Sequence, residues 1–209
     1  MNDVIGAKYL QVEKSVYFMD YSIFTVEVPV REHGKPEIIE AKDREIENLK
    51  TYETFEEVEE NGQETIGSRW IVTEKQKHDG QKQAYKARLV AKGFQEINQP
   101  QSDSPTAAKE SFKLLMALAA NQNFKVVSMD IRAAFLQAKK LDREVFVRPP
   151  DDIKKERKIW KLLKPLYGLD DASRKFYLKV KETLQELGLK TLPGDDGFYY
   201  VIRNGVLGQ

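Results

Sequence analysis

The sequence predicts an α+β protein in which antiparallel strands pack with amphipathic helices. Residues 69–75 and 83–92 alternate polar and apolar side chains on either side of a turn sequence, His78-Asp79-Gly80, as in a β-hairpin. Apolar side chains recur at helical spacing over about residues 37–50 and again from about Ala172. Strand and helix patterns thus follow one another along 209 residues, a length that allows a sizeable core.

The composition excludes several classes of protein. Hydrophobic residues make up 41% and charged residues 32%, which is typical of a soluble globular chain. No apolar run approaches the roughly 18 residues of a membrane span, and the first residues lack a signal-peptide pattern, so we expect an intracellular protein. The chain has no cysteine, which excludes disulfides and thiolate metal sites, and we expect His33 and His78 to be surface residues.

The charge is distributed unevenly along the chain. Residues 1–66 carry 7 basic and 16 acidic side chains, whereas residues 67–209 carry 27 and 17. A basic segment of this kind either binds a polyanion such as nucleic acid or is simply an uneven solvated surface, and charge alone does not separate these two interpretations.

Before the hairpin, the sequence predicts one helix and a connector. We assign no function to an N-terminal extension over residues 1–36. Pro36 suits a first helical position, and Ile38, Ile39, Ile46 and Leu49 mark one face of the helix that follows. The acidic residues 53–64 then predict a solvated connector leading into the domain at residue 67.

The returning strand of the hairpin has a basic face. Alternation places Tyr85, Ala87 and Leu89 on one side of the strand, and Lys86, Arg88 and Lys92 on the other. The basic face fits phosphate binding, and it fits an ordinary solvent-exposed face as well.

Further elements follow from the rest of the pattern. Ser104-Pro105 predicts a helix start, and Phe112, Leu115, Met116 and Ala119 form a stripe expected to lie in the core. Strands are predicted over residues 144–148, 159–163 and 198–202, with a sharp turn at residues 167–169 and a helix that ends before Gly188.

The apolar run of residues 126–130 predicts a buried strand that ends in a carboxylate, Asp130. An acid at the end of a rigid strand either holds a divalent metal or caps the turn that follows. From this stretch alone both interpretations stay open.

Four motifs in order carry a family resemblance. They are KARLVAKGF at residues 86–94, MDIRAAFL at 129–136, VFVRPP at 145–150 and WKLLKPLYGL at 160–169. Together they resemble the reverse transcriptase domain of copia-type LTR retrotransposon Pol polyproteins, over about residues 37–209. The resemblance implies the fingers and an incomplete palm of a right-hand polymerase, with the fingers and partial palm over residues 67–209.

The resemblance also implies two-metal nucleotidyl transfer, with Mg²⁺ or Mn²⁺ in the complete enzyme. Asp130 resembles the first metal-binding aspartate, with the Ile131 backbone carbonyl as a second ligand. Ala133 and Ala134 resemble the small residues whose amides face the triphosphate, and Phe135 resembles the aromatic gate that favours deoxynucleotides.

Further nucleotide contacts are implied in the fingers and beyond. Arg88 resembles the arginine that touches the base and phosphates of the incoming nucleotide, and Lys77, or else Lys75, reaches the γ-phosphate. Tyr167, Gly168 and Leu169 resemble the border of nucleotide and template. Asp171 stands where the family often has Gln, so it either lies near the nucleotide or N-caps the next helix.

The second catalytic motif of the family, an apolar residue followed by two aspartates on a palm hairpin, does not occur in this sequence. Asp195-Asp196 precedes a strand instead, and we expect it to be a surface loop. We therefore expect a fragment of an RNA-directed DNA polymerase that is inactive alone and binds no metal tightly. Its implied partners are an RNA template, a DNA primer and deoxynucleotides, without a membrane; the oligomeric state stays open. The alternative is a non-catalytic relic that binds nucleic acid or protein.

Overall fold

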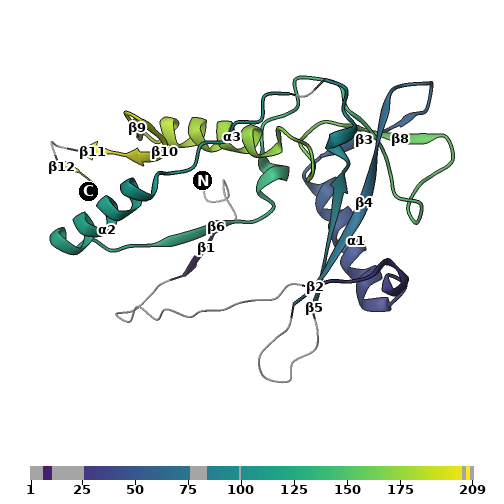
Figure 1. The fold of residues 1–209 in the computed structure, drawn as a ribbon, viewed down its shortest axis with the longest axis horizontal. Helices are drawn as coiled ribbons and strands as arrows, with labels where there is room; N and C mark the ends of the chain where they lie inside the picture. The colour runs from purple at the N-terminus through teal and green to yellow at the C-terminus, as the bar shows by residue number, and fades with distance from the viewer. Residues whose placement is uncertain (1–6, 11–25, 76–83, 99, 204–205, 208–209) are drawn as a thin grey trace.

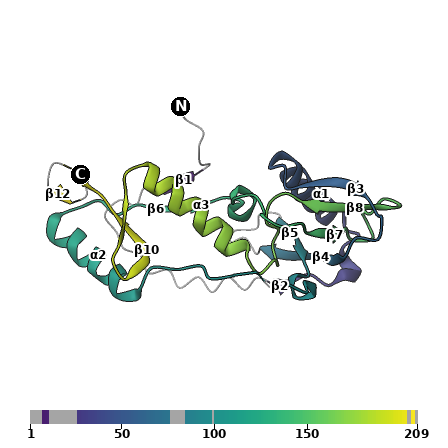
Figure 2. The same ribbon diagram turned by 90° about the horizontal axis from the view of Figure 1, so that it is seen from above.

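The computed structural model describes residues 7–10, 26–75, 84–98, 100–203 and 206–207. Its helices and mainly antiparallel strands alternate along the chain, which confirms the α+β class. Figures 1 and 2 show an elongated molecule with two groups of elements. A six-stranded sheet and helix α1 form one group, and helices α2 and α3 with short strand pairs form the other.

The larger sheet has the strand order β2-β4-β7-β8-β3, with β5 paired to β4. Strand β4 pairs with β5 over its whole second part, from Ser68 opposite Ala91 to Lys75 opposite Ala84, which confirms the two strands of the sequence-based hairpin. The first residues of β4 pair in parallel with β7. The strand bounds are Val26–Glu27 (β2), Phe55–Glu59 (β3), Thr65–Lys75 (β4), Ala84–Ala91 (β5), Phe146–Arg148 (β7) and Lys158–Leu162 (β8).

Helix α1 (Pro36–Thr51), predicted over about residues 37–50, contributes to the core of this sheet, although Ile39 of the predicted apolar face is 47% exposed. Ile38 and Leu49 are fully buried, and they belong to the same cluster as Ala87 and Leu89 on the apolar face of β5. Burying side chains of the size of Ile38 or Leu49 stabilises the fold by about 1.5–3 kcal/mol each. The core therefore fixes the orientation of β5, with Ala87 and Leu89 on its buried face and the side chains of Lys86 and Arg88 more exposed.

The prediction of a solvated acidic connector was wrong for residues 55–59, which form β3. This strand pairs along its full length with β8. The Phe55 ring stacks on Trp160 with centroids 3.9 Å apart, and the carboxylates of Glu57 and Glu59 form ion pairs with Lys155 and Lys158. Partner lysines and one aromatic pair therefore let a glutamate-rich segment form a strand.

Helix α2 (Lys109–Gln122) begins later than predicted, and its stripe is not core. Ser104 does not cap it, because the Ser104 hydroxyl donates to the carbonyl of Ser173. Phe112 is 58% exposed and Leu115 is 40% exposed, whereas Ala119 is buried. Helical spacing identified the correct helix, but no described element covers most of its apolar face.

The prediction of a buried strand at residues 126–130 was also wrong. Strand β6 (Ser128–Ile131) pairs with β1 (Ala7–Leu10) in a separate two-stranded sheet. Val126, Val127 and Met129 are more than half exposed. An apolar run predicts burial only if another element packs on it, and in the part of the chain that the structure describes none does so here.

Helix α3 (Ala172–Glu186) was predicted correctly, and Gly188 follows it with φ +84°, as a C′ glycine does. Strands β9 (Lys190–Leu192) and β10 (Asp195–Tyr200) form a second pair, and β11 (Ile202–Arg203) and β12 (Val206–Leu207) form a third. None of the described helices combines the length and apolar character that crossing a membrane requires. Among the described residues there are also the short 3₁₀ helices η1 (Val30–Glu32), η2 (Gly93–Gln95) and η3 (Ala134–Gln137).

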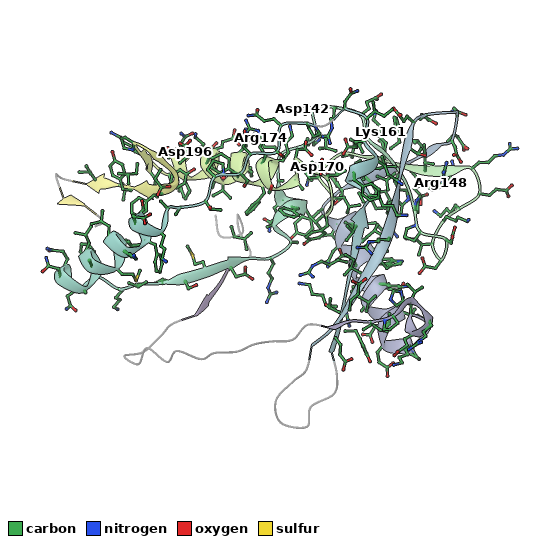
Figure 3. The ribbon with its side chains drawn as sticks, in the orientation of Figure 1. Asp142, Arg148, Lys161, Asp170, Arg174 and Asp196 are labelled. Atoms are coloured by element: carbon green, nitrogen blue, oxygen red, sulfur yellow. The ribbon has the colours of Figure 1, made fainter. Side chains whose placement is uncertain are left out.

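The expectation of a surface loop at residues 195 and 196 was wrong for Asp195, which lies in β10 and is buried. Its carboxylate accepts hydrogen bonds from the backbone N–H groups of Ala108, at 2.9 Å, and Gly197, at 3.0 Å. A hydrogen bond with the Ser111 side chain and these backbone bonds lower the pKa of Asp195. Asp195 therefore anchors the start of α2. Asp196 is exposed beside α3 (Figure 3).

Candidate functional site

Three side chains that sequence reasoning had assigned separately lie together beside the larger sheet. The Arg88 guanidinium lies over the Tyr167 ring, 5.8 Å from its centroid. The Phe135 ring packs against Tyr167 at 5.2 Å between centroids and against Phe176 of α3 at 6.4 Å. We call Arg88, Phe135 and Tyr167 the Arg88 cluster. It combines a cation with aromatic rings, which suits a ligand that carries both an anionic group and a planar ring.

The backbone fixes Tyr167 against the edge of β5. The Ala91 N–H donates to the Tyr167 carbonyl at 2.7 Å, and Val90 forms a parallel bridge with Tyr167. Gly168 follows with φ +89°, and a Cβ there would lie 2.1 Å from the Ala91 carbonyl oxygen. Only glycine allows this approach. The predicted turn at residues 167–169 is confirmed, and Leu169 is buried beneath it.

Helix η3 presents the small residues next to Phe135. Ala133 has φ +49° and precedes η3, and its carbonyl accepts the Leu136 N–H at 2.9 Å. Leu136 is buried in the main core, and Ala133 and Phe135 pack on that core. The segment with Ala133 and Ala134 is thereby anchored to the same body as Arg88. Whether their amides face a ligand stays a prediction.

Burial and two opposite charges act on the Tyr167 hydroxyl. Burial raises the pKa of Tyr167 most, and the carboxylate of Glu45 on α1 raises it further, whereas the charge and a hydrogen bond of Arg88 lower it. Glu45 is itself buried, and burial raises its pKa above the ordinary 4.5. Sequence reasoning missed Glu45, although its spacing from Ile38 and Leu49 places it on the same face of the helix.

Asp130 does not join the Arg88 cluster through any contact among the described residues. It is exposed on β6, where it lies opposite Lys8 in the ladder, and Ile131 ends the strand. Within the described ranges no three His, Cys, Asp or Glu side chains are grouped so that they could hold a metal ion. One carboxylate and one carbonyl do not make a two-metal site. The residues present therefore do not fit the metal pair, and we assign no chemical step through a metal to this chain.

The predicted γ-phosphate contact lies outside the described residues. Lys77 falls in residues 76–83, which the structure does not describe. Lys75 ends β4, where its backbone pairs with Ala84. Its assignment as a phosphate contact stays a prediction.

Asp171 belongs to a buried ion-pair network that sequence reasoning missed. Arg143 binds Asp171 at 2.6 Å and Glu96 at 2.8 Å, and the Asp171 side chain is only 2% exposed. Asp171 occupies the N-cap position of α3 but makes no side-chain capping bond. Burial alone lowers the pKa of Arg143, and the two carboxylates outweigh it and raise the pKa. The unusual Asp at position 171 was the one signal of this network. Its neighbour Asp170, labelled in Figure 3, is exposed.

A groove with a volume of about 740 Å³ has a mixed charged lining. Its basic side chains are Lys42, Arg69, Lys92 and Arg148, and its acidic ones are Glu27, Asp151 and Asp152. Lys42 pairs with Asp152 and Arg148 with Glu60, whereas Arg69 and Lys92 form no ion pair with the described residues. Two cations of this groove are thus available to an anionic partner.

Comparison with known proteins identifies the class of protein. Residues 51–206 match the family model described as reverse transcriptase (RNA-dependent DNA polymerase). The chain belongs to this family, in the form found in Pol polyproteins of copia-type transposons.

Several curated relatives match with similar identities. The chain is 32% identical over 143 residues to the retrovirus-related Pol polyprotein from transposon RE1 of Arabidopsis thaliana, covering 66% of this chain and 10% of the relative. It is 32% identical over 152 residues to the retrovirus-related Pol polyprotein from transposon TNT 1-94 of Nicotiana tabacum, covering 69% of this chain and 11% of the relative. It is 30% identical over 172 residues to the transposon Ty1-DR4 Gag-Pol polyprotein of Saccharomyces cerevisiae, covering 77% and 10%.

The chain thus spans about a tenth of the length of the curated relatives it matches. No solved structure matches it significantly.

Proposed function

We propose that residues 67–209 form the fingers and part of the palm of a copia-type reverse transcriptase, and that the Arg88 cluster borders its incoming deoxynucleotide. The observation that carries the proposal is the contact of Arg88, Tyr167 and Phe135, which come from three separate motifs of the family resemblance. A guanidinium beside aromatic rings suits a nucleotide, because phosphates bind the cation and the base stacks on a ring.

Within this proposal each residue has one task. Arg88 binds phosphate oxygens, and the Phe135 ring excludes a ribose 2′-hydroxyl. Gly168 lets Tyr167 and Leu169 approach β5 closely enough to form the floor of the site. Asp130 is proposed as a metal ligand only in a longer protein that supplies further carboxylates.

The chain alone is expected not to extend a primer. Two-metal phosphoryl transfer requires several carboxylates held together, and the sequence supplies only Asp130 in a matching motif. The test is primer extension on an RNA template by the purified 209 residues with Mg²⁺ or Mn²⁺. Extension that is lost in Asp130→Asn would contradict the proposal for this chain.

A second candidate function is nucleic-acid binding without catalysis, which Arg69 and Lys92 favour, the two groove cations that form no ion pair with the described residues. Such binding rests on phosphate contacts, so its affinity falls steeply as salt rises. A mobility-shift titration with an RNA–DNA hybrid at about 50 and about 200 mM salt tests it. Affinity that is independent of salt would count against this function.

A further inference from the structure

Helix α1 places one carboxylate next to the Arg88 cluster that neither the family resemblance nor the sequence pattern assigned. Glu45 is only 8% exposed, because it lies on the helix face that packs on β5. Its Oε1 atom is buried and has no hydrogen-bond partner among the described residues. A buried polar atom without a partner is rare in folded proteins, so this position calls for an explanation beyond packing.

The neighbours of Glu45 show where its carboxylate lies relative to β5. Burial raises the pKa of Glu45 most, and the nearby backbone N–H of Leu89 on β5 lowers it. The N–H of Ala91, two residues further along β5, donates to the Tyr167 carbonyl. Glu45 and Tyr167 therefore occupy neighbouring places on one edge of β5, next to Arg88.

Several charged and titratable groups face this carboxylate. Arg88 and Lys86 come from β5, and Tyr167 comes from the turn before α3. The charge of Arg88 acts on Glu45 through space, without a hydrogen bond between the two side chains among the described contacts. Because Glu45 is buried, water screens this interaction less than it would at an exposed site.

We propose that Glu45 is a positioning residue for Arg88, a resident counter-charge that competes with the phosphates of a bound nucleotide and gains a proton when they bind. This inference rests on the proposed function, because it requires that Arg88 contact those phosphates. A triphosphate adds negative charge near a carboxylate that is already buried. The neutral acid then becomes the favoured form, so anion binding and proton uptake are linked.

The experiment measures binding of inorganic tripolyphosphate to the 209-residue chain by NMR titration at about pH 5 and about pH 8, with a chelator present. Glu45→Gln keeps the acceptor for Leu89 and removes the charge. We expect this variant to bind about fivefold more tightly than the wild type at the higher pH, and the difference to shrink at the lower pH, where a larger fraction of Glu45 is protonated. The protonation of tripolyphosphate changes with pH in the same way for both proteins. The ratio of their two dissociation constants therefore reports the effect of Glu45 alone.

A second readout needs no variant. Saturating tripolyphosphate is expected to raise the titration midpoint of the Glu45 carboxyl carbon in the wild-type chain, as reciprocal linkage requires. Arg88→Ala shows whether binding depends on Arg88. If it does, equal affinities of the wild type and Glu45→Gln at the higher pH, together with an unchanged Glu45 midpoint, would overturn the inference and leave the proposed function standing. Absence of Arg88-dependent binding would overturn both.

Discussion

At the scale of single residues, Gly168 has the most restricted position near the candidate site. A side chain there meets both a left-handed backbone and the Ala91 carbonyl, whereas Gly188 has a similar φ of +84° with no atom within 4 Å of the place that a Cβ would take. The two glycines therefore separate conformational cost from steric cost.

We expect Gly168→Ala to lower the free energy of unfolding by more than about 2 kcal/mol, because strain and overlap with backbone atoms add. The matched Gly188→Ala should cost only about 1–2 kcal/mol, since it carries the backbone strain alone. Urea denaturation of both variants measures the difference. Equal losses would mean that the close approach at Gly168 is not a real constraint.

Arg143 offers a second comparison between residues. Its removal leaves Glu96 and Asp171 as neighbouring buried carboxylates, so Arg143→Ala is expected to cost about 3 kcal/mol. Arg148→Ala breaks an exposed pair with Glu60 and should cost less than about 1 kcal/mol. Thermal or urea unfolding distinguishes them, and a cost for Arg143→Ala below that of Arg148→Ala would contradict a stabilising network.

At the scale of elements, the sequence pattern predicted the helices and strands whose stability comes mainly from interactions within the same segment of the chain. The β4–β5 hairpin, α1 and α3 were found because alternation or helical spacing directly reflects which face meets the core. Strand β3 was missed, because its stability comes from β8, far along the chain. Strand β6 was taken as buried, because its composition shows that it is apolar but not what covers it.

Helix α2 depends on an acid that the sequence pattern placed in a loop. Asp195 has a lowered pKa, so its ionised form is favoured by folding. The stabilisation is present above the ordinary value of 3.8 and is lost as the pH falls below it. We expect Asp195→Asn to unfold at a temperature that changes less with pH between about 5 and about 3 than that of the wild type. An unchanged pH dependence, followed by circular dichroism, would refute the anchoring role.

At the scale of the whole molecule, burial is concentrated in the group formed by the larger sheet and α1. Apolar side chains from α2 to β6 remain exposed, as Val127 does at 55%, whereas Val147 of β7 is fully buried. The two groups of elements in Figure 2 therefore contribute unequally to stability.

Two valine substitutions measure this inequality. Val147→Ala is expected to cost about 2 kcal/mol, because it removes buried methyl groups and leaves a cavity. Val127→Ala should change the free energy of unfolding by less than about 0.5 kcal/mol, as surface substitutions do. Chemical denaturation provides both values, and a large cost at Val127 would indicate that the segment just before β6 is covered in the folded chain.

The residues of the candidate site could be named from the sequence, but the contacts that bring them together could not. The family motifs named Arg88, Phe135 and Tyr167, and the contacts among them follow from the bridge between Val90 and Tyr167, which no local pattern encodes. Helical spacing placed Glu45 on the face of Ile38 and Leu49, but the groups around it and the network of Arg143 were not predictable, because they come from segments distant in sequence.

The central claim is that Arg88 anchors the phosphates of a deoxynucleotide in this chain. Equilibrium binding of dTTP to the wild type, Arg88→Ala and Arg148→Ala tests it most directly, since both variants lose one positive charge. We expect Arg88→Ala to weaken binding about tenfold or more, the value of a charge-assisted hydrogen bond, while Arg148→Ala binds like the wild type. Equal affinities for Arg88→Ala and the wild type would contradict the claim.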